Sequence, residues 1–308
     1  MNITSNFFVK SPLVKNSLIA STSFKGTNSI QNDSFTVLRN QNDNTLEAEL
    51  FADRMYSLIE KGKGNISQIE KMAKKSIPFI QVRNIADIDN ILGEGSSKRY
   101  NAYTLPEYKQ DCTLNKISMY VPGLDPTESH SRKISVLASS AHEFTHCLQR
   151  TRDNSYMGLK EVTNGNLYGA RCLNSFSAMV FGSLEQLKAE LALMPEKAAH
   201  CTTQEEALYS AFDCQSQEEF KKLVKRTFLN TYNEAHEVFT KNPGVRKYMP
   251  SPRDLRKIIK NQCRTRSEME QEAYTVQKHV IEKYDRDNLT TINEYAPVFY
   301  KEIAKALE

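Results

Sequence analysis

The sequence contains no long apolar stretch and no closely spaced cysteines. No run of about 18 or more apolar residues occurs among its 308 residues, so no membrane-spanning helix is expected. The six cysteines lie far apart and form no C-x-x-C pair. This spacing favours free thiols over a disulfide framework and disfavours a zinc site built from cysteines. The cysteines are Cys112, Cys147, Cys172, Cys201, Cys214 and Cys263.

Acidic residues are absent from the first part of the chain. Residues 1–32 contain none and are rich in Ser, Thr and Asn. Lys10 and Pro12 interrupt any apolar core of a secretory signal, and Arg39, the first arginine, comes late for a mitochondrial presequence. Residues 1–45 are therefore expected to form a disordered tail in a cytoplasmic protein. Alternatively, this acid-poor leader resembles the export signals of bacterial type III secretion effectors, which implies secretion into the cytoplasm of a host cell.

Strand patterns come before helical patterns along the chain. Residues 46–75 are typical of a helix, a turn and a second helix. Residues 78–85 and 115–124 are typical of strands, and residues 93–105 are typical of a glycine turn that leads into a strand. A helix is expected at 132–150, and the residues beyond about 155 are mostly helical in pattern. This order predicts an α+β fold with a small N-terminal sheet and a large helical C-terminal part.

The predicted helix at 132–150 carries the pattern H-E-x-x-H at residues 142–146. Its two histidines, His142 and His146, lie one turn apart, so that both imidazoles can bind one metal ion. Glu143 lies on a neighbouring face, from which its carboxylate can take a proton from a water molecule that zinc activates. Since the motif is short, the alternative is an ordinary amphipathic helix. The residues expected on its buried face are Ile134, Leu137, Ala138, Ala141, Thr145 and Leu148.

A third ligand is expected to be a carboxylate, because no H-E-x-x-H-x-x-G-x-x-H pattern follows His146. On a helix covering 267–284, Glu270 points into the apolar face, and Glu272, at the margin of that face, is the fallback ligand. A carboxylate directed into an apolar face needs a partner, and a metal ion is one such partner. Alternatively, Ser267 and Glu270 form the S-x-x-E capping box that begins a helix.

These two segments together resemble the gluzincin-type zinc metallopeptidases, in which H-E-x-x-H on one helix is completed by a glutamate from a later helix. The resemblance implies that His142, His146 and Glu270 bind Zn²⁺. It implies that Glu143 is the general base and then the general acid. Tyr274 is a candidate for stabilising the oxyanion, although a packing role is the alternative. The long separation of His146 from Glu270 departs from the compact members and implies a large helical insertion.

The resemblance also implies a zincin-like fold. Residues 46–308 would form the metallopeptidase domain, with the sheet and the active-site helix in 46–150 and the third ligand in 151–308. In such enzymes an edge strand above the active-site helix pairs with extended substrate backbone. Residues 115–121 are the candidate for that strand.

The leading functional hypothesis is a zinc endopeptidase acting on a protein substrate, with the leader suggesting a host protein. A second hypothesis is a zinc peptidase that acts on the cell's own proteins. A third is a non-catalytic interaction protein that binds an acidic partner through the basic region 241–266, in which Asp254 is the single acid. No nucleic acid is expected, because Tyr248 is the one aromatic residue in that region and no fold signature accompanies it. The sequence predicts no particular oligomeric state.

Overall fold

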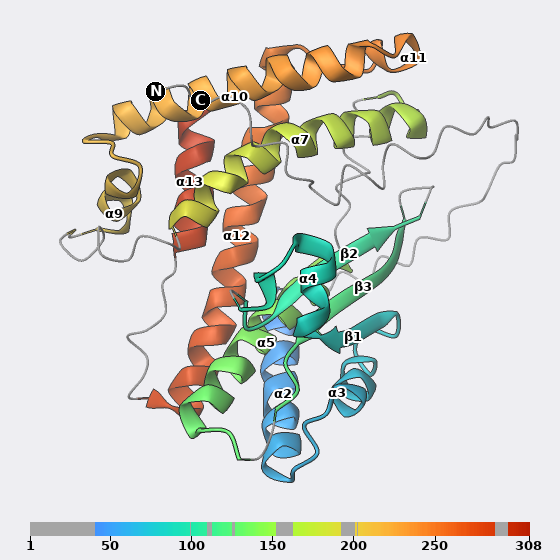
Figure 1. The fold of residues 1–308 in the computed structure, drawn as a ribbon, viewed down its shortest axis with the longest axis vertical. Helices are drawn as coiled ribbons and strands as arrows, with labels where there is room; N and C mark the ends of the chain where they lie inside the picture. Colours follow the sequence, from blue (N-terminus) through green and yellow to red (C-terminus); the bar gives the residue numbers. More distant parts are fainter. Residues whose placement is uncertain are drawn as a thin grey trace, which may run out of the picture.

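Helices pack around and beyond a small three-stranded sheet (Figure 1). This arrangement, in a computed structural model, confirms the α+β class, with the sheet in the N-terminal half and a mostly helical remainder. The structure describes residues 41–98, 100–109, 113–124, 127–151, 163–191, 201, 203–286 and 295–308. Residues 1–40 of the predicted tail therefore lie outside the described residues, as does Cys112.

The N-terminal half contains the sheet and the helix with the H-E-x-x-H motif. Its longer elements are α2 (Gln41–Glu60), α3 (Ile66–Ala73), β1 (Ile80–Asn84), β2 (Tyr103–Tyr108), β3 (Leu114–Val121) and α5 (His130–Arg150). Three short helical segments join β1 to β2: η1 (Ile85–Ile88), α4 (Asp89–Leu92) and η2 (Ser96–Lys98). The helix α2 begins at Gln41, earlier than the predicted boundary at residue 46.

The regular elements that the structure describes in the C-terminal half are all helices. Its helices are α7 (Leu167–Leu191), α9 (Gln204–Ala211), α10 (Gln217–Thr240), α11 (Pro243–Arg246), α12 (Pro252–Tyr284) and α13 (Tyr295–Ala306). No helix in the described part of the chain is both long and apolar enough to cross a membrane. The described cysteines, which exclude Cys112, are all free thiols.

The sheet has the strand order β1-β3-β2, with β3 in the centre. The strand β1 runs parallel to β3, and β2 runs antiparallel to it. The prediction that residues 115–121 form the edge strand is therefore wrong. Because Ile117 to Val121 are buried on both faces of the sheet, alternation of apolar residues does not distinguish this strand from an edge strand. Among the described residues, the edge strand beside α5 is β2.

The helix α12 is continuous over 33 residues, which corresponds to roughly 50 Å at 1.5 Å per residue. It begins at Ser251, whose hydroxyl accepts a hydrogen bond from the Asp254 amide at 3.2 Å, with Pro252 in the first turn. No glycine or further proline interrupts it. The alternative of a capping box at Ser267 and Glu270 is therefore wrong, and the Ser267 hydroxyl donates instead to the Pro297 carbonyl at 2.8 Å.

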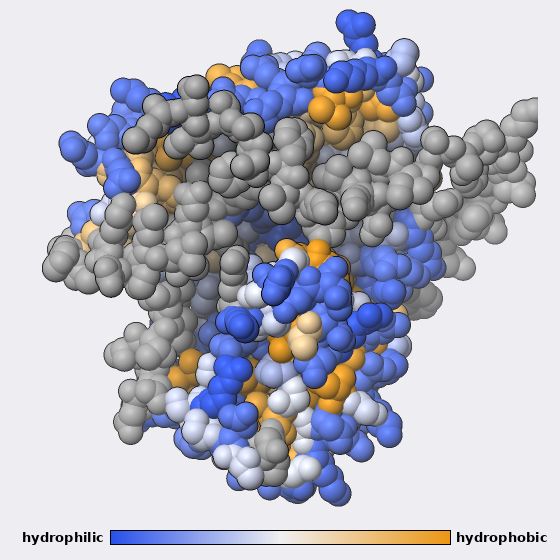
Figure 2. Space-filling model, viewed as in Figure 1, coloured by the Kyte–Doolittle hydropathy of each residue, from blue (hydrophilic) through white to orange (hydrophobic). Residues whose placement is uncertain are grey.

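One hydrophobic core lies in the lower part of Figure 1, among α2, α3, the sheet, α5 and the C-terminal part of α12. Phe51 of α2 stacks on Phe144 of α5, with ring centroids 4.0 Å apart. The helix α12 contributes Val276, Val280 and Ile281 to this core. Hydrophilic side chains predominate on the described part of the face in Figure 2, where apolar residues form only small patches.

A second hydrophobic core lies among α7, α9, α10, α13 and the N-terminal part of α12. Here α12 contributes Leu255, Ile259 and Cys263. The same helix therefore packs into both cores. Glu270 lies in the segment between these two sets of residues, at the junction of the cores.

Asp53 of α2 connects this helix to the C-terminal end of α12. Its carboxylate accepts hydrogen bonds from Lys283 Nζ at 2.8 Å and from the Tyr284 hydroxyl at 2.7 Å. Burial disfavours the charged carboxylate, but the hydrogen bonds from Lys283 and Tyr284 and the positive charge of Lys283 outweigh it and lower the pKa of Asp53. The ionised form of Asp53 therefore stabilises the packing of α2 against α12.

We expect Asp53→Asn to lower the free energy of unfolding at neutral pH by about 1 kcal/mol, because it removes the charge that accepts these hydrogen bonds. The pKa of Asp53 is lower in the folded protein than in the unfolded chain, where it is about 3.9. The stabilisation is therefore complete well above about pH 4. It is lost as the pH falls through the pKa that Asp53 has in the folded protein. Thermal unfolding of both proteins across this range measures the effect. Glu282→Gln, at an exposed carboxylate of α12, is the control. An equal loss in the control would contradict the assignment.

Candidate metal centre

His142 and His146 lie on the side of α5 that faces α12. The rotation of α5 is fixed by Phe144 and Leu148, which are buried in the first core. The Nε2 atoms of the two imidazoles are 3.1 Å apart. His142 is only 9 % exposed and His146 is half-buried, so both rings are largely removed from water.

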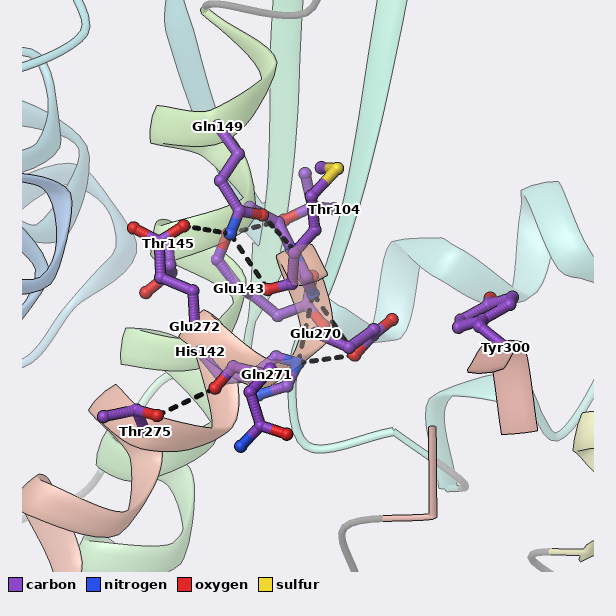
Figure 3. Close-up of polar contacts among 12 residues, drawn as sticks. Thr104, His142, Glu143, Thr145, Gln149, Glu270, Gln271, Glu272, Thr275 and Tyr300 are labelled. Carbon is purple, nitrogen blue, oxygen red and sulfur yellow. Dashed lines mark hydrogen bonds and ion pairs between the residues drawn. The ribbon is translucent and has the colours of Figure 1, made fainter. Parts of the chain in front are cut away.

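The structure brings Glu270 of α12 to these imidazoles, as predicted from the sequence. Its Oε2 atom lies 3.5 Å from Nε2 of His142 and 3.6 Å from Nε2 of His146. Glu270 is 8 % exposed, and Figure 3 shows its carboxylate directed at the side chain of His142. The helix α5 therefore contributes two candidate ligands, His142 and His146. The helix α12, more than a hundred residues further along the chain, brings the third candidate, Glu270, to the same point.

The three donor atoms have the spacing that a tetrahedral metal ion requires. Metal–ligand bonds of about 2.0–2.2 Å place neighbouring donor atoms of a tetrahedron roughly 3.3–3.6 Å apart. The separations of 3.5 and 3.6 Å between Glu270 and the two imidazoles fall in this range, and the Nε2–Nε2 separation of 3.1 Å is slightly shorter. His142, His146 and Glu270 thus form a group that could hold a metal ion.

The charges around the group favour a cation. Burial opposes protonation of His146, but the nearby negative charges of Glu270 and Glu143 outweigh it and raise the pKa of His146. The negative potential that favours a proton at this position also favours a metal ion. A bound cation would offset the cost of burying the Glu270 carboxylate.

Glu143 lies beside the group without belonging to it. Its backbone carbonyl accepts a hydrogen bond from the Thr104 hydroxyl of β2 at 3.2 Å, which ties the edge strand to α5. Its half-buried carboxylate is close enough to His146 to raise the pKa of that imidazole. No described side chain forms a hydrogen bond or ion pair with the Glu143 carboxylate. This carboxylate is therefore able to accept a proton.

Tyr274 and Glu272 occupy two different places near the group. The Tyr274 ring meets the His142 ring edge to face, with centroids 4.7 Å apart, and also packs against the second core. The carboxylate of Glu272 accepts a hydrogen bond from Nε2 of Gln149 at 2.8 Å (Figure 3). Glu272, the fallback ligand from the sequence, is therefore not among the converging donor atoms, whereas Glu270 is.

The other described histidines lie elsewhere. His130 Nε2 is 3.0 Å from the Tyr284 carbonyl, His279 Nδ1 is 2.7 Å from Glu49, and His236 stacks on an aromatic ring. Cys147 follows His146 directly but points toward Thr104, with its sulfur 3.6 Å from that hydroxyl. Burial raises the pKa of Cys147 to about 12, so it remains a neutral thiol and is unsuited to metal binding.

Two residues near this site, Gln149 and Tyr103, were not identified from the sequence. Gln149 accepts a hydrogen bond from Nδ1 of His146 at 2.8 Å. It lies three residues after His146 on the same helix, and this spacing is a signal that could have identified it. Burial, together with the charge of Glu143, raises the pKa of Tyr103 on β2, so this phenol stays protonated near the site. The sequence pattern of residues 93–105 gives no indication that Tyr103 lies near the site.

The chain matches no protein-family model, and neither a curated protein nor a solved structure is significantly similar to it. The geometry of the site therefore carries the functional argument on its own.

We expect the protein to bind one divalent metal ion per chain, with zinc and cobalt as test ions. Glu270→Gln should weaken binding by more than about 100-fold, because the loss of even an outer partner of a ligand costs roughly 10–100-fold. Metal analysis of purified protein and titration against a competing chelator measure both quantities. Glu268→Gln, at an exposed glutamate of the same helix, should bind metal like the unmodified protein. Equal affinities of all three proteins would remove Glu270 from the site.

Proposed function

We propose that the protein is a zinc-dependent endopeptidase that hydrolyses peptide bonds of a protein substrate. The observation that carries the proposal is the convergence of His142, His146 and Glu270 at tetrahedral spacing beside the Glu143 carboxylate. Two imidazoles and one carboxylate are the ligand set of many catalytic zinc sites, which leave a fourth position for water or substrate. This donor set also suits zinc better than magnesium or calcium, which prefer oxygen ligands alone.

Glu143 acts as the general base in this proposal. When bound, a zinc ion would supply Lewis-acid chemistry, which polarises a carbonyl oxygen and lowers the pKa of water toward about 7. The Glu143 carboxylate takes the proton from the attacking water and then delivers it to the nitrogen of the leaving amine. Its position at the edge of the imidazole pair, free of a described partner, supports this role. Tyr274, whose ring contacts His142, is the candidate hydrogen-bond donor to the oxyanion.

The edge strand β2 is the proposed binding element for extended substrate backbone. Among the described residues it pairs on one side only, with β3, and it lies beside α5. The hydrogen bond from Thr104 to the Glu143 carbonyl fixes it relative to the proposed base. A peptide added as a further strand along the side of β2 that faces away from β3 would run past the metal site.

The geometry of the site does not support two of the predictions from the sequence, namely export of the protein and an interaction through the basic region 241–266. Export through residues 1–45, and hence action on a host protein, stays a prediction, because residues 1–40 lie outside the described residues. In the basic region, Arg253 and Lys257 are exposed, while Arg264 pairs with Glu308 at 2.6 Å. The interaction-protein hypothesis therefore depends on charge alone.

We expect Glu143→Gln to lower proteolytic turnover by about 100-fold or more, because it removes the base while it preserves the size of the side chain. Zinc affinity and thermal stability should stay close to those of the unmodified protein. Incubation of both proteins with a proteome, followed by identification of the new N-termini, measures the effect and identifies the substrate.

The control is Glu268→Gln, which removes a carboxylate of α12 that is exposed to solvent. Its set of new N-termini should equal that of the unmodified protein. If Glu143→Gln produced the same N-termini at the same rate, the proposed mechanism would be wrong. If zinc-loaded protein produced none, the proposal of an endopeptidase would be wrong.

A further inference from the structure

The side-chain amide of Gln149 lies between His146 on its own helix and the backbone and side chains of α12. Its Oε1 atom is 2.8 Å from Nδ1 of His146. Its Nε2 atom donates to the Met269 carbonyl at 2.9 Å and to the Glu272 carboxylate at 2.8 Å (Figure 3). The amide is thus fully hydrogen-bonded, with one group on α5 and two groups on α12.

The two contacts with α12 determine which way the amide points. A carbonyl and a carboxylate only accept hydrogen bonds, so both require the NH₂ group of Gln149. The opposite orientation would place Oε1 of Gln149 against the oxygens of Met269 and Glu272, and two donors would be lost. The oxygen of Gln149 therefore faces His146.

The orientation of the amide determines the tautomer of His146. Because Oε1 of Gln149 only accepts, Nδ1 of His146 must carry the proton. In the neutral imidazole, Nε2 then has a free lone pair. This atom lies 3.6 Å from Oε2 of Glu270 and 3.1 Å from Nε2 of His142, at the centre of the candidate metal site.

We propose that Gln149 and Glu272 form a positioning pair that holds His146 in the tautomer and orientation for metal binding. The proposal rests on the metal site that underlies the proposed function. The Glu272 carboxylate polarises the Gln149 amide, which makes Oε1 a stronger acceptor and Nε2 of His146 a stronger donor of electrons to a cation. Glu272, the fallback ligand from the sequence, thus acts through two other side chains and does not bind the metal ion.

The test combines zinc affinity with nitrogen NMR of the histidine side chains. In metal-free protein, under conditions where the nitrogen signals show a neutral ring, His146 should carry its proton on Nδ1. In Gln149→Met this preference should be lost, and zinc should bind roughly 10–100-fold more weakly. The matched control is Gln271→Met, the same change at an exposed position of α12, which should leave both readouts unchanged.

Glu272 provides a second pair of variants if Gln149→Met does not fold. Glu272→Gln keeps an oxygen that accepts from Gln149, and its zinc affinity should stay within a few-fold of the unmodified protein. Glu272→Leu removes the acceptor and should weaken zinc binding by about tenfold. This difference between a conservative and a non-conservative change is not expected of a residue that serves stability alone.

The outcomes separate this inference from the proposed function. Unchanged zinc affinity in both Gln149→Met and Glu272→Leu, or a proton on Nε2 of His146 in the metal-free protein, would overturn the positioning pair and leave the endopeptidase proposal standing. If the unmodified protein bound no zinc, the proposed function would fail. The NMR measurement on the metal-free protein would still decide whether Gln149 sets the tautomer.

Discussion

The site depends on the packing of α5 against α12, which places a buried carboxylate against two imidazoles. A charged side chain at the junction of two hydrophobic cores is costly unless positive charge or hydrogen-bond donors meet it. Here the Glu270 carboxylate faces the Nε2 atoms of His142 and His146, and a cation bound by the three side chains would offset this cost. The helix α12 is held by apolar residues in both cores, so the backbone at Glu270 cannot shift relative to α5 without disturbing one of these cores.

This construction makes the site rigid. All three donor atoms belong to residues of long helices. Next to these residues, the side chain of Gln149 on α5 donates a hydrogen bond to the Met269 carbonyl of α12 and so connects the two helices directly. The proposed base, Glu143, lies on the same helix as the imidazoles, and Thr104 holds the edge strand to its backbone. Side chains on rigid elements, supported by a second layer of hydrogen bonds, keep the geometry that a metal site and the proposed hydrolysis would require.

Local patterns in the sequence predicted the elements well, whereas contacts between distant segments were harder to predict. All six residues expected on the inner face of α5 are buried, but so are Phe144 and Cys147, because the sheet, α2 and α12 enclose the helix on several sides. The segment around Glu270 was compatible with a cap or a ligand, and only its packing against α5 decides between them. The edge strand was misassigned because strand order depends on which distant segments pair. Gln149 was missed because its partners on α12 are 120 and 123 positions away.

The most direct test of the central claim is X-ray absorption at the zinc edge of the loaded protein. We expect a first shell of nitrogen and oxygen atoms at about 2.0–2.2 Å from the zinc ion. The more distant atoms of two imidazole rings should add their scattering beyond this shell. In Glu270→Gln this first shell should change while the imidazole scattering persists. A sulfur shell at about 2.3 Å, or scattering from a single imidazole, would contradict the assigned site.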